Sequence, residues 1–100
     1  MIVRIVRMTF RPEEVDNFLR VFNESKERIR GFEGCLHLEL WQEADQPNVL
    51  TTYSHWTGPE ALENYRHSEL FQATWSRTKV LFAAKPVATS FRPLQVVGKN

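Results

Sequence analysis

The segment from Cys35 to Trp41 combines side chains that could do chemistry with the alternating pattern of a β-strand. Side chains on a strand point alternately to its two faces, so the three leucines share one face and the functional side chains share the other. The functional group consists of Cys35, His37, Glu39 and Trp41. A surface that mixes imidazole, carboxylate and indole is too polar for an ordinary core and too aromatic for open water. We therefore expect it to line a cavity that a second subunit closes.

His37 and Glu39 are the candidate catalytic residues of this segment. The imidazole of His37 could orient a substrate or take a proton from it, and a desolvated Glu39 carboxylate would have a raised pKa that suits a proton acceptor. Structural roles are also open: His37 as a hydrogen-bonded residue of a subunit interface, and Glu39 as the partner of an arginine such as Arg7. Arg7 and Trp41 are expected to contact the substrate beside them.

A cysteine nucleophile and a metal site are both disfavoured. Cys35 and His37 are expected on one face, but i,i+2 neighbours on a strand diverge too far for a tight nucleophile–base pair, so an inert, buried thiol is expected. The three histidines fall on three different predicted elements without a spaced carboxylate pair, which is not a recognisable ligand set. The four glycines are scattered and form no phosphate-binding loop. We expect no metal or other cofactor.

The first part of the chain predicts a strand and a helix. Residues 2–10 are rich in β-branched side chains and alternate as a strand, on which Arg4 and Arg7 point to opposite faces. One of these two arginines is expected on the same face as the functional side chains of Cys35–Trp41. Apolar residues at helical spacing then predict a helix that ends at Gly31.

The remainder of the chain predicts a β-hairpin, further helical segments and a last strand. Residues 35–43 and 49–56 are separated by a polar turn with proline, which is typical of an antiparallel hairpin. Thr57 and Glu60 have the spacing of a capping box and predict the start of a second helix, followed by another helical segment. Residues 87–97 predict the final strand.

This order is the split β-α-β-β-α-β pattern of a ferredoxin-like α+β fold, in which the helices cover one face of a four-stranded antiparallel sheet. Residues 1–100 are expected to form a single domain. The uncovered face would carry His37, Trp41 and Phe91 or Leu94, which are too apolar to leave in water. A contiguous apolar patch normally marks an interface. We therefore expect a homodimer formed by stacking two open sheet faces, with one pocket enclosed per subunit.

The composition argues against several classes of partner. A hydrophobic fraction of 42% and a charged fraction of 25% are typical of a soluble globular protein. A net charge of +1, with acids and bases interleaved, gives no reason to expect nucleic acid. No apolar run approaches the ~20 residues that span a bilayer, and the first residues predict a strand and not a signal peptide. The single cysteine suits a reducing compartment, so a cytoplasmic location without a membrane partner is predicted.

Two further motifs, taken with the order of elements, point to a known family. Trp56 closes the second strand of the hairpin in the run Ser54-His55-Trp56, and residues 60–71 are EALENYRHSELF. Over about residues 2–96 the chain resembles the antibiotic biosynthesis monooxygenase family, whose members are small dimeric α+β barrels. The family often has a histidine where this chain has Tyr65, and His67 follows two places later.

The resemblance implies cofactor-free oxygenation of an electron-rich aromatic, such as a polyketide-like phenol or a quinol. Once deprotonated, such a substrate can itself pass an electron to O₂, so the protein needs a dry pocket, a base or donor for the phenol, and a group that stabilises the anion. Trp56 joins His37 and Glu39 as a candidate catalytic residue. The candidate substrate-binding residues are Arg7, Trp41, Tyr53, Tyr65 and His67. Core packing would also explain Tyr65, and a surface position would explain His67.

Two other functions are left open. The absence of the common histidine at Tyr65 favours a non-catalytic dimeric module that shelters a small aromatic or lipid-like ligand. A second branch of the family degrades haem with an asparagine, a tryptophan and an axial histidine. Trp56 could match the tryptophan, but Trp75 stands about where the histidine is expected and residues 1–10 contain no asparagine. With two of three residues missing, haem degradation is disfavoured.

Overall fold

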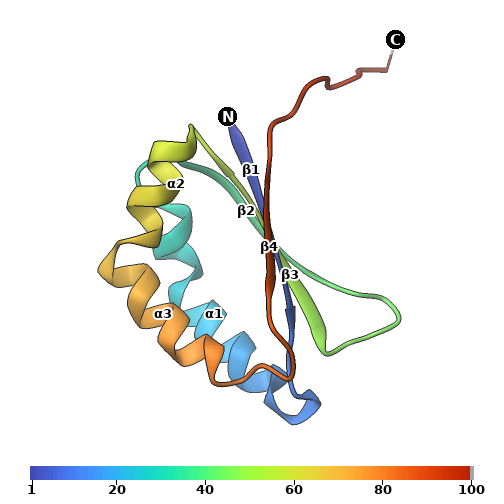
Figure 1. Ribbon diagram of the computed structural model, residues 1–100. Coiled ribbons are helices and arrows are strands. Elements are labelled where there is room, and N and C mark those ends of the chain that lie inside the picture. Colours follow the sequence, from blue (N-terminus) through green and yellow to red (C-terminus); the bar gives the residue numbers. More distant parts are fainter. Residues whose placement is uncertain (100) are drawn as a thin grey trace.

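The computed structural model describes residues 1–99, which form a four-stranded antiparallel sheet and three α-helices (Figure 1). The elements are β1 (Ile2–Thr9), a 3-10 turn η1 (Pro12–Glu14), α1 (Val15–Arg30), β2 (Cys35–Gln42), β3 (Val49–Trp56), α2 (Pro59–Arg66), α3 (Glu69–Lys79) and β4 (Val87–Phe91). The strand order is β2-β3-β1-β4. This is the ferredoxin-like arrangement that the sequence predicts.

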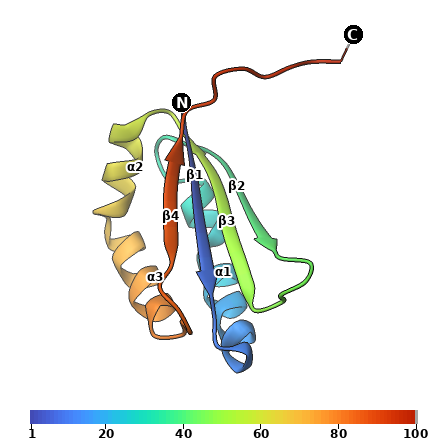
Figure 2. The ribbon, with the colours of Figure 1, turned by 45° about the vertical axis from the view of Figure 1, so that its right-hand side comes forward.

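The three helices lie on one side of the sheet, and the opposite face carries no helix within residues 1–99 (Figures 1 and 2). Amphipathic α1 crosses behind the strands, and α2 and α3 follow one another beside it (Figure 2). The face without helices is called the open face below. The two faces therefore have different environments, and the direction of each strand side chain decides which environment it meets.

The strand register assigns side chains to the two faces. β1 pairs with β3 from Ile2 opposite Trp56 to Thr9 opposite Val49 without a shift. Even-numbered residues of both strands face the helices, as the burial of Met8 and Trp56 among helical side chains shows. Arg4 and Arg7 consequently point to opposite faces, as predicted, with Arg7 on the open face.

Two clusters of buried side chains join the sheet to the helices. One consists of Met8, Phe10, Phe18, Leu50 and Leu81, and the other of Ile2, Cys35, Trp56 and Leu62. In the first cluster the rings of Phe10 and Phe18 stack with their centroids 4.4 Å apart. Burial of this apolar surface is the main force that holds the helices on the sheet.

Cys35 lies in the core, contrary to its predicted place beside His37. The pairing of β2 with β3 shifts register between these two residues, so the alternation does not continue through Leu36. Cys35 packs against Trp56 and Leu62, and Leu36 is left 45% exposed. Burial raises the pKa of the Cys35 thiol, which agrees with the expected inert role.

Two predicted element boundaries are wrong. Helix α2 begins with Pro59, and its N-cap Gly58 provides no side chain, so the capping box of Thr57 and Glu60 does not form. The observed side-chain cap belongs to α3, where Ser68 Oγ accepts a hydrogen bond of 3.1 Å from the backbone N–H of Phe71. Strand β4 ends at Phe91, which pairs with Val3 near the start of β1, and not at residue 97.

The turn between α1 and β2 depends on a glycine. Gly34 has a φ of +90°, and a Cβ atom there would lie 2.4 Å from the Cβ of Ala61. Only glycine adopts this conformation without strain, and the close approach brings the start of α2 against the turn.

We expect Gly34→Ala to lower the free energy of unfolding by about 2–4 kcal/mol, because it adds backbone strain and a clash with α2. The matched control is Gly58→Ala, since nothing lies within 4 Å of a Cβ at Gly58. That control should stay within about 0.5 kcal/mol of the parent protein. Urea unfolding followed by circular dichroism measures both, and equal stabilities would contradict the prediction.

Candidate active site

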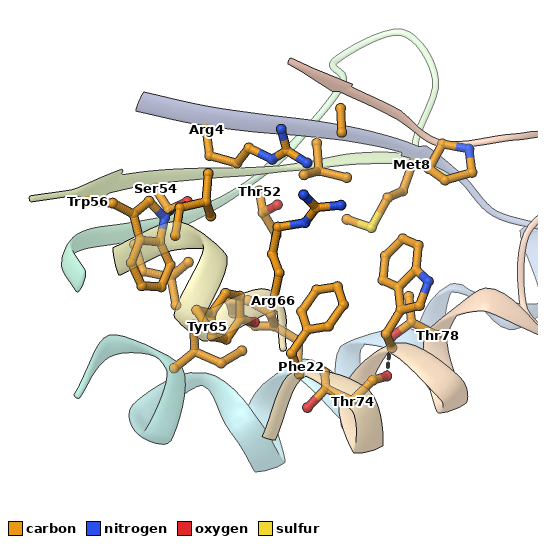
Figure 3. A pocket seen from close by; sticks show the side chains of 18 of the residues that line it. Arg4, Met8, Phe22, Thr52, Ser54, Trp56, Tyr65, Arg66, Thr74 and Thr78 are labelled. Atoms are coloured by element: carbon orange, nitrogen blue, oxygen red, sulfur yellow. Dashed lines mark hydrogen bonds between the residues drawn. The ribbon is translucent and has the colours of Figure 1, made fainter. Parts of the chain in front are cut away.

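The best-enclosed cavity found in the described residues lies between the sheet and the helices of a single chain (Figure 3). Its volume is about 280 Å³, close to the lower limit of roughly 300 Å³ for small-molecule sites. β1, β3 and β4 line one side, and α1, α2 and α3 line the other. The pocket expected on the open face would need a second subunit to close it, so it stays a prediction beside this cavity of the single chain.

Most of the cavity wall is apolar and aromatic. Phe18 and Phe22 of α1 face the cavity from below the sheet, and Phe71 and Trp75 contribute from α3. The rings of Phe71 and Trp75 lie nearly parallel, at 11°, with centroids 5.8 Å apart. Walls of this kind favour a flat aromatic ligand and exclude water.

Trp56 and Tyr65 form one end of the cavity. The indole of Trp56 is 1% exposed, and it stacks on the Tyr65 ring with centroids 4.9 Å apart. Its N–H donates a hydrogen bond of 3.0 Å to Ser54 Oγ, which satisfies a buried donor and fixes the ring. Burial raises the pKa of Tyr65 far above its usual value, so its hydroxyl stays protonated and can only donate or accept hydrogen bonds.

The polar lining comes from two arginines and several hydroxyl groups. Arg4 of β1 and Arg66 of α2 both line the cavity, with Thr52 of β3 beside them (Figure 3). Arg4 Nη1 donates a hydrogen bond of 3.0 Å to Ser90 Oγ on β4. Arg66 Nη1 lies 2.8 Å from Glu63 Oε1, one turn earlier on the same helix.

The two ionised residues in the cavity lining, Arg4 and Arg66, are both cationic. Partial burial lowers the pKa of Arg4, and the neighbouring Arg66 guanidinium lowers it further, while Glu63 acts in the opposite sense. Among the residues that the structure describes, no aspartate, glutamate or histidine lines the cavity. The site can therefore stabilise an anion, but it offers no general base of its own.

His37, Glu39 and Trp41 lie together on the open face, away from the cavity. Glu39 accepts hydrogen bonds from the rings of both His37 and Trp41, the latter at 2.8 Å. Both bonds lower the pKa of Glu39 in the single chain, and the bond from His37 has the larger effect. The sequence interpretation expected a raised pKa, which would require the desolvation of a closed pocket. Hydrogen bonds to the carboxylate outweigh desolvation at this exposed position.

The other predicted site residues divide between the same surroundings. Tyr53 joins the open-face group, where it stacks on Trp41 at 4.6 Å and bonds His55 through its hydroxyl at 2.6 Å. Arg7 is also on the open face and pairs with Glu43 at 2.6 Å. His67 ends α2 on the exposed surface and does not line the cavity. Of the predicted site residues, the cavity thus brings together Trp56 and Tyr65.

Sequence reasoning missed the arginines and hydroxyl groups of the cavity. Arg4 was predicted on the face opposite Arg7, but it was not named as a site residue. The alternation along β3 puts Thr52 on the same face as Trp56, and this was the available signal for it. Arg66 sits on an exposed helical turn, and the sequence has no signal that it reaches a cavity. No group of three potential metal ligands occurs in residues 1–99, and no helix there is long and apolar enough to cross a membrane.

We expect His37→Asn to raise the pKa of Glu39 toward its usual value, because the strongest hydrogen bond to the carboxylate is lost. In the parent protein the bond favours the folded state above the unfolded-state pKa and fades as the pH falls through the lower folded-state pKa. A carbon-13 NMR titration of the Glu39 carboxyl measures the change. An unchanged titration would show that His37 does not hold this carboxylate.

Comparisons with known proteins agree with the fold and the motifs. The family model described as antibiotic biosynthesis monooxygenase matches residues 1–76. No curated protein sequence matches the chain. A crystal structure of an antibiotic biosynthesis monooxygenase superposes with a TM-score of 0.89 at 19% identity, covering 95% of this chain and 100% of that chain.

Two further solved structures share the fold. A conserved protein from Methanosarcina mazei Go1 has a TM-score of 0.86 at 22% identity, with 92% of each chain covered. A mutant of SnoaB, a cofactor-independent oxygenase from Streptomyces nogalater, has a TM-score of 0.85 at 17% identity, covering 98% of this chain and 97% of that chain. At these identities the structures show a shared fold, whereas the family match extends over three quarters of the sequence. The chain belongs to the antibiotic biosynthesis monooxygenase family.

Proposed function

We propose that this protein is a cofactor-independent monooxygenase that oxidises a small phenolic, quinol-like or polyketide-like aromatic compound with O₂. The observation that carries the proposal is the aromatic cavity between sheet and helices, with two guanidinium groups in its lining. Membership of the family supports this chemistry, and SnoaB, which shares the fold, is described as a cofactor-independent oxygenase. The substrate ring would lie among the aromatic walls, with its oxygen toward the arginines.

The reaction needs no external reductant if the substrate supplies the electrons. In an anthrone-like phenol, one atom of O₂ converts a methylene group to a carbonyl, and the other leaves as water with the two methylene hydrogens. The substrate thereby loses the four electrons that O₂ accepts. Electron transfer to O₂ begins from the deprotonated substrate, so stabilising its anion is the main task of the protein.

Positive charge takes the place of a base in this proposal. A phenol beside Arg4 and Arg66 ionises more readily, because each guanidinium group stabilises the phenolate. The proton would pass to water at the mouth of the cavity, where the Arg66 side chain is 45% exposed. His37 and Glu39, which lie on the open face, have no part in this step. Trp56 and the protonated Tyr65 would hold and orient the ring.

A sheltering role without catalysis is the second candidate. The cavity has no acid–base residue among those described, and a binding module needs none. Both functions require the same bound aromatic compound. They differ in whether O₂ is consumed faster than in the spontaneous reaction.

We also propose that the open face pairs two copies of the chain. Trp41 is 42% exposed and Phe91 is 50% exposed on this face, at its opposite edges. Apolar side chains continue between them across β3 and β1. Burying such a patch against a second copy would remove it from water and desolvate the His37–Glu39 pair.

A panel of hydroquinones and anthrone-like phenols should give oxygen uptake above the spontaneous rate, in an oxygen-electrode assay. Thr52→Phe, which fills the cavity, should lower the rate by roughly 100-fold, because a displaced substrate loses its alignment. His37→Asn separates the two faces: an unchanged rate supports the cavity, and a similar loss would place the chemistry on the open face. If no compound gives oxygen uptake above the spontaneous rate, the oxygenase proposal is wrong and the non-catalytic binding module remains.

Sedimentation velocity should give the mass of two chains at micromolar concentration. Ile5→Glu puts a carboxylate at the centre of the open face, where dimerisation would bury it, so this variant should sediment as a monomer. Ala73→Glu, on the exposed surface of α3, is the control and should remain dimeric. A monomeric parent protein would overturn the proposed pairing.

A further inference from the structure

Two cationic side chains meet in the cavity from distant parts of the sequence. Arg4 extends from β1 and Arg66 from the last residue of α2, and Figure 3 shows the Arg66 side chain rising past Thr52 toward Arg4. Both positions are set by regular structure, since Arg4 is fixed by its pairing opposite Ser54 and Arg66 follows the stacked Tyr65. The two groups therefore share one end of the cavity as a consequence of the fold.

The charges of these residues are incompletely balanced. Arg4 bonds the neutral hydroxyl of Ser90, and in the described residues it forms no ion pair within 4 Å. Arg66 is paired with Glu63, whose side chain is 52% exposed to water. The guanidinium groups of Arg4 and Arg66 are balanced by the single carboxylate of Glu63, which leaves a net charge of +1 at this end of the cavity.

Two guanidinium groups repel each other when they are held close together without an anion between them. The lowered pKa of Arg4, to which both burial and Arg66 contribute, reflects this environment. A bound anion would reverse the repulsion and would also replace the water that Arg4 loses on partial burial. The cavity is thus prepared for negative charge before any substrate ionises.

We propose that the cavity selects aromatic substrates that carry a carboxylate group next to the phenol oxygen, and that Arg4 and Arg66 bind this carboxylate with the phenol oxygen beside it. The inference rests on the proposed function and narrows its substrate class. A planar carboxylate matches the fork of N–H donors on guanidinium and is ionised at neutral pH, whereas a phenol must first lose a proton. A single negative charge balances the surplus, while a phosphate would exceed it and need more of the small cavity.

Calorimetric titration with matched naphthalene compounds tests the inference without turnover. The probes are 3-hydroxy-2-naphthoate, its neutral amide analogue 3-hydroxy-2-naphthamide, and 2-naphthyl phosphate, all under nitrogen. The carboxylate should bind at least about tenfold more tightly than the amide, and also more tightly than the phosphate. Equal affinity for the carboxylate and the amide would overturn the inference. If the phosphate bound most tightly, the inferred carboxylate substrate would be wrong and a phosphate ester would take its place.

Substitutions of arginine test which residues produce the preference for carboxylate over amide. Arg4→Gln and Arg66→Gln should each lower the carboxylate-to-amide ratio several-fold, and the double variant should bring it to about one. Amide affinity should persist, which shows that the cavity is intact. Arg77→Gln removes an arginine that pairs with Glu24 at 2.8 Å on the outer surface, and it should leave the ratio unchanged. A ratio that survives in the double variant would contradict the assignment.

The two proposals can fail separately. Selective carboxylate binding without oxygen uptake would retain the anion site and remove the oxygenase function. Oxygen uptake with neutral phenols and no preference for carboxylate would retain the oxygenase function and remove the anion site.

Discussion

The unshifted pairing of β1 with β3 is the constraint on which the rest of the structure depends. Because Ile2 lies opposite Trp56 and Arg4 opposite Ser54, one set of alternate side chains from both strands meets the helices. A slip of one residue would reverse the faces of one strand relative to the other, so Arg4 and Trp56 could no longer both point toward the helices. The core and the cavity would be lost together, since both are built from the same alternation.

Trp56 connects stability with the chemistry of the site. Its indole fills the core cluster near Cys35 and Leu62, donates to Ser54 and stacks on Tyr65. The stacking fixes the end of α2 against the sheet, and Arg66 is the next residue along the helix. The burial of Trp56 therefore supports the fold and also helps to set where Arg66 enters the cavity.

The two faces of the sheet hold polar groups in different dielectric surroundings. On the open face, His37 and Glu39 are exposed to water, which screens their charges and weakens their influence on anything beyond contact. On the helix side, Arg4 is half-buried among apolar walls, where the same unit of charge acts more strongly on a ligand. In the single chain, this difference favours the helix side as the place where a charged side chain acts most strongly on a bound ligand.

The sequence by itself determined the ferredoxin-like order of elements, the family, and for most strand residues which of them lie on the same face of the sheet. The alternation of side chains along a strand is a local property, so it predicted that Arg4 and Arg7 lie on opposite faces of the sheet. Local pattern could not show the bulge that sends Cys35 into the core, because either register of that strand is consistent with the same residues.

Tertiary structure alone decided which face the helices cover, and with it the location of the cavity. His37, Glu39 and Trp41 carry side chains suited to catalysis, yet α1 packs on Leu38 and Leu40 of the same strand, so those three lie on the open face. Arg66 reaches the cavity only through the docking of α2. Such placement depends on contacts between residues far apart in the chain, and these arise from the packing of whole elements and not from the spacing of residues within one.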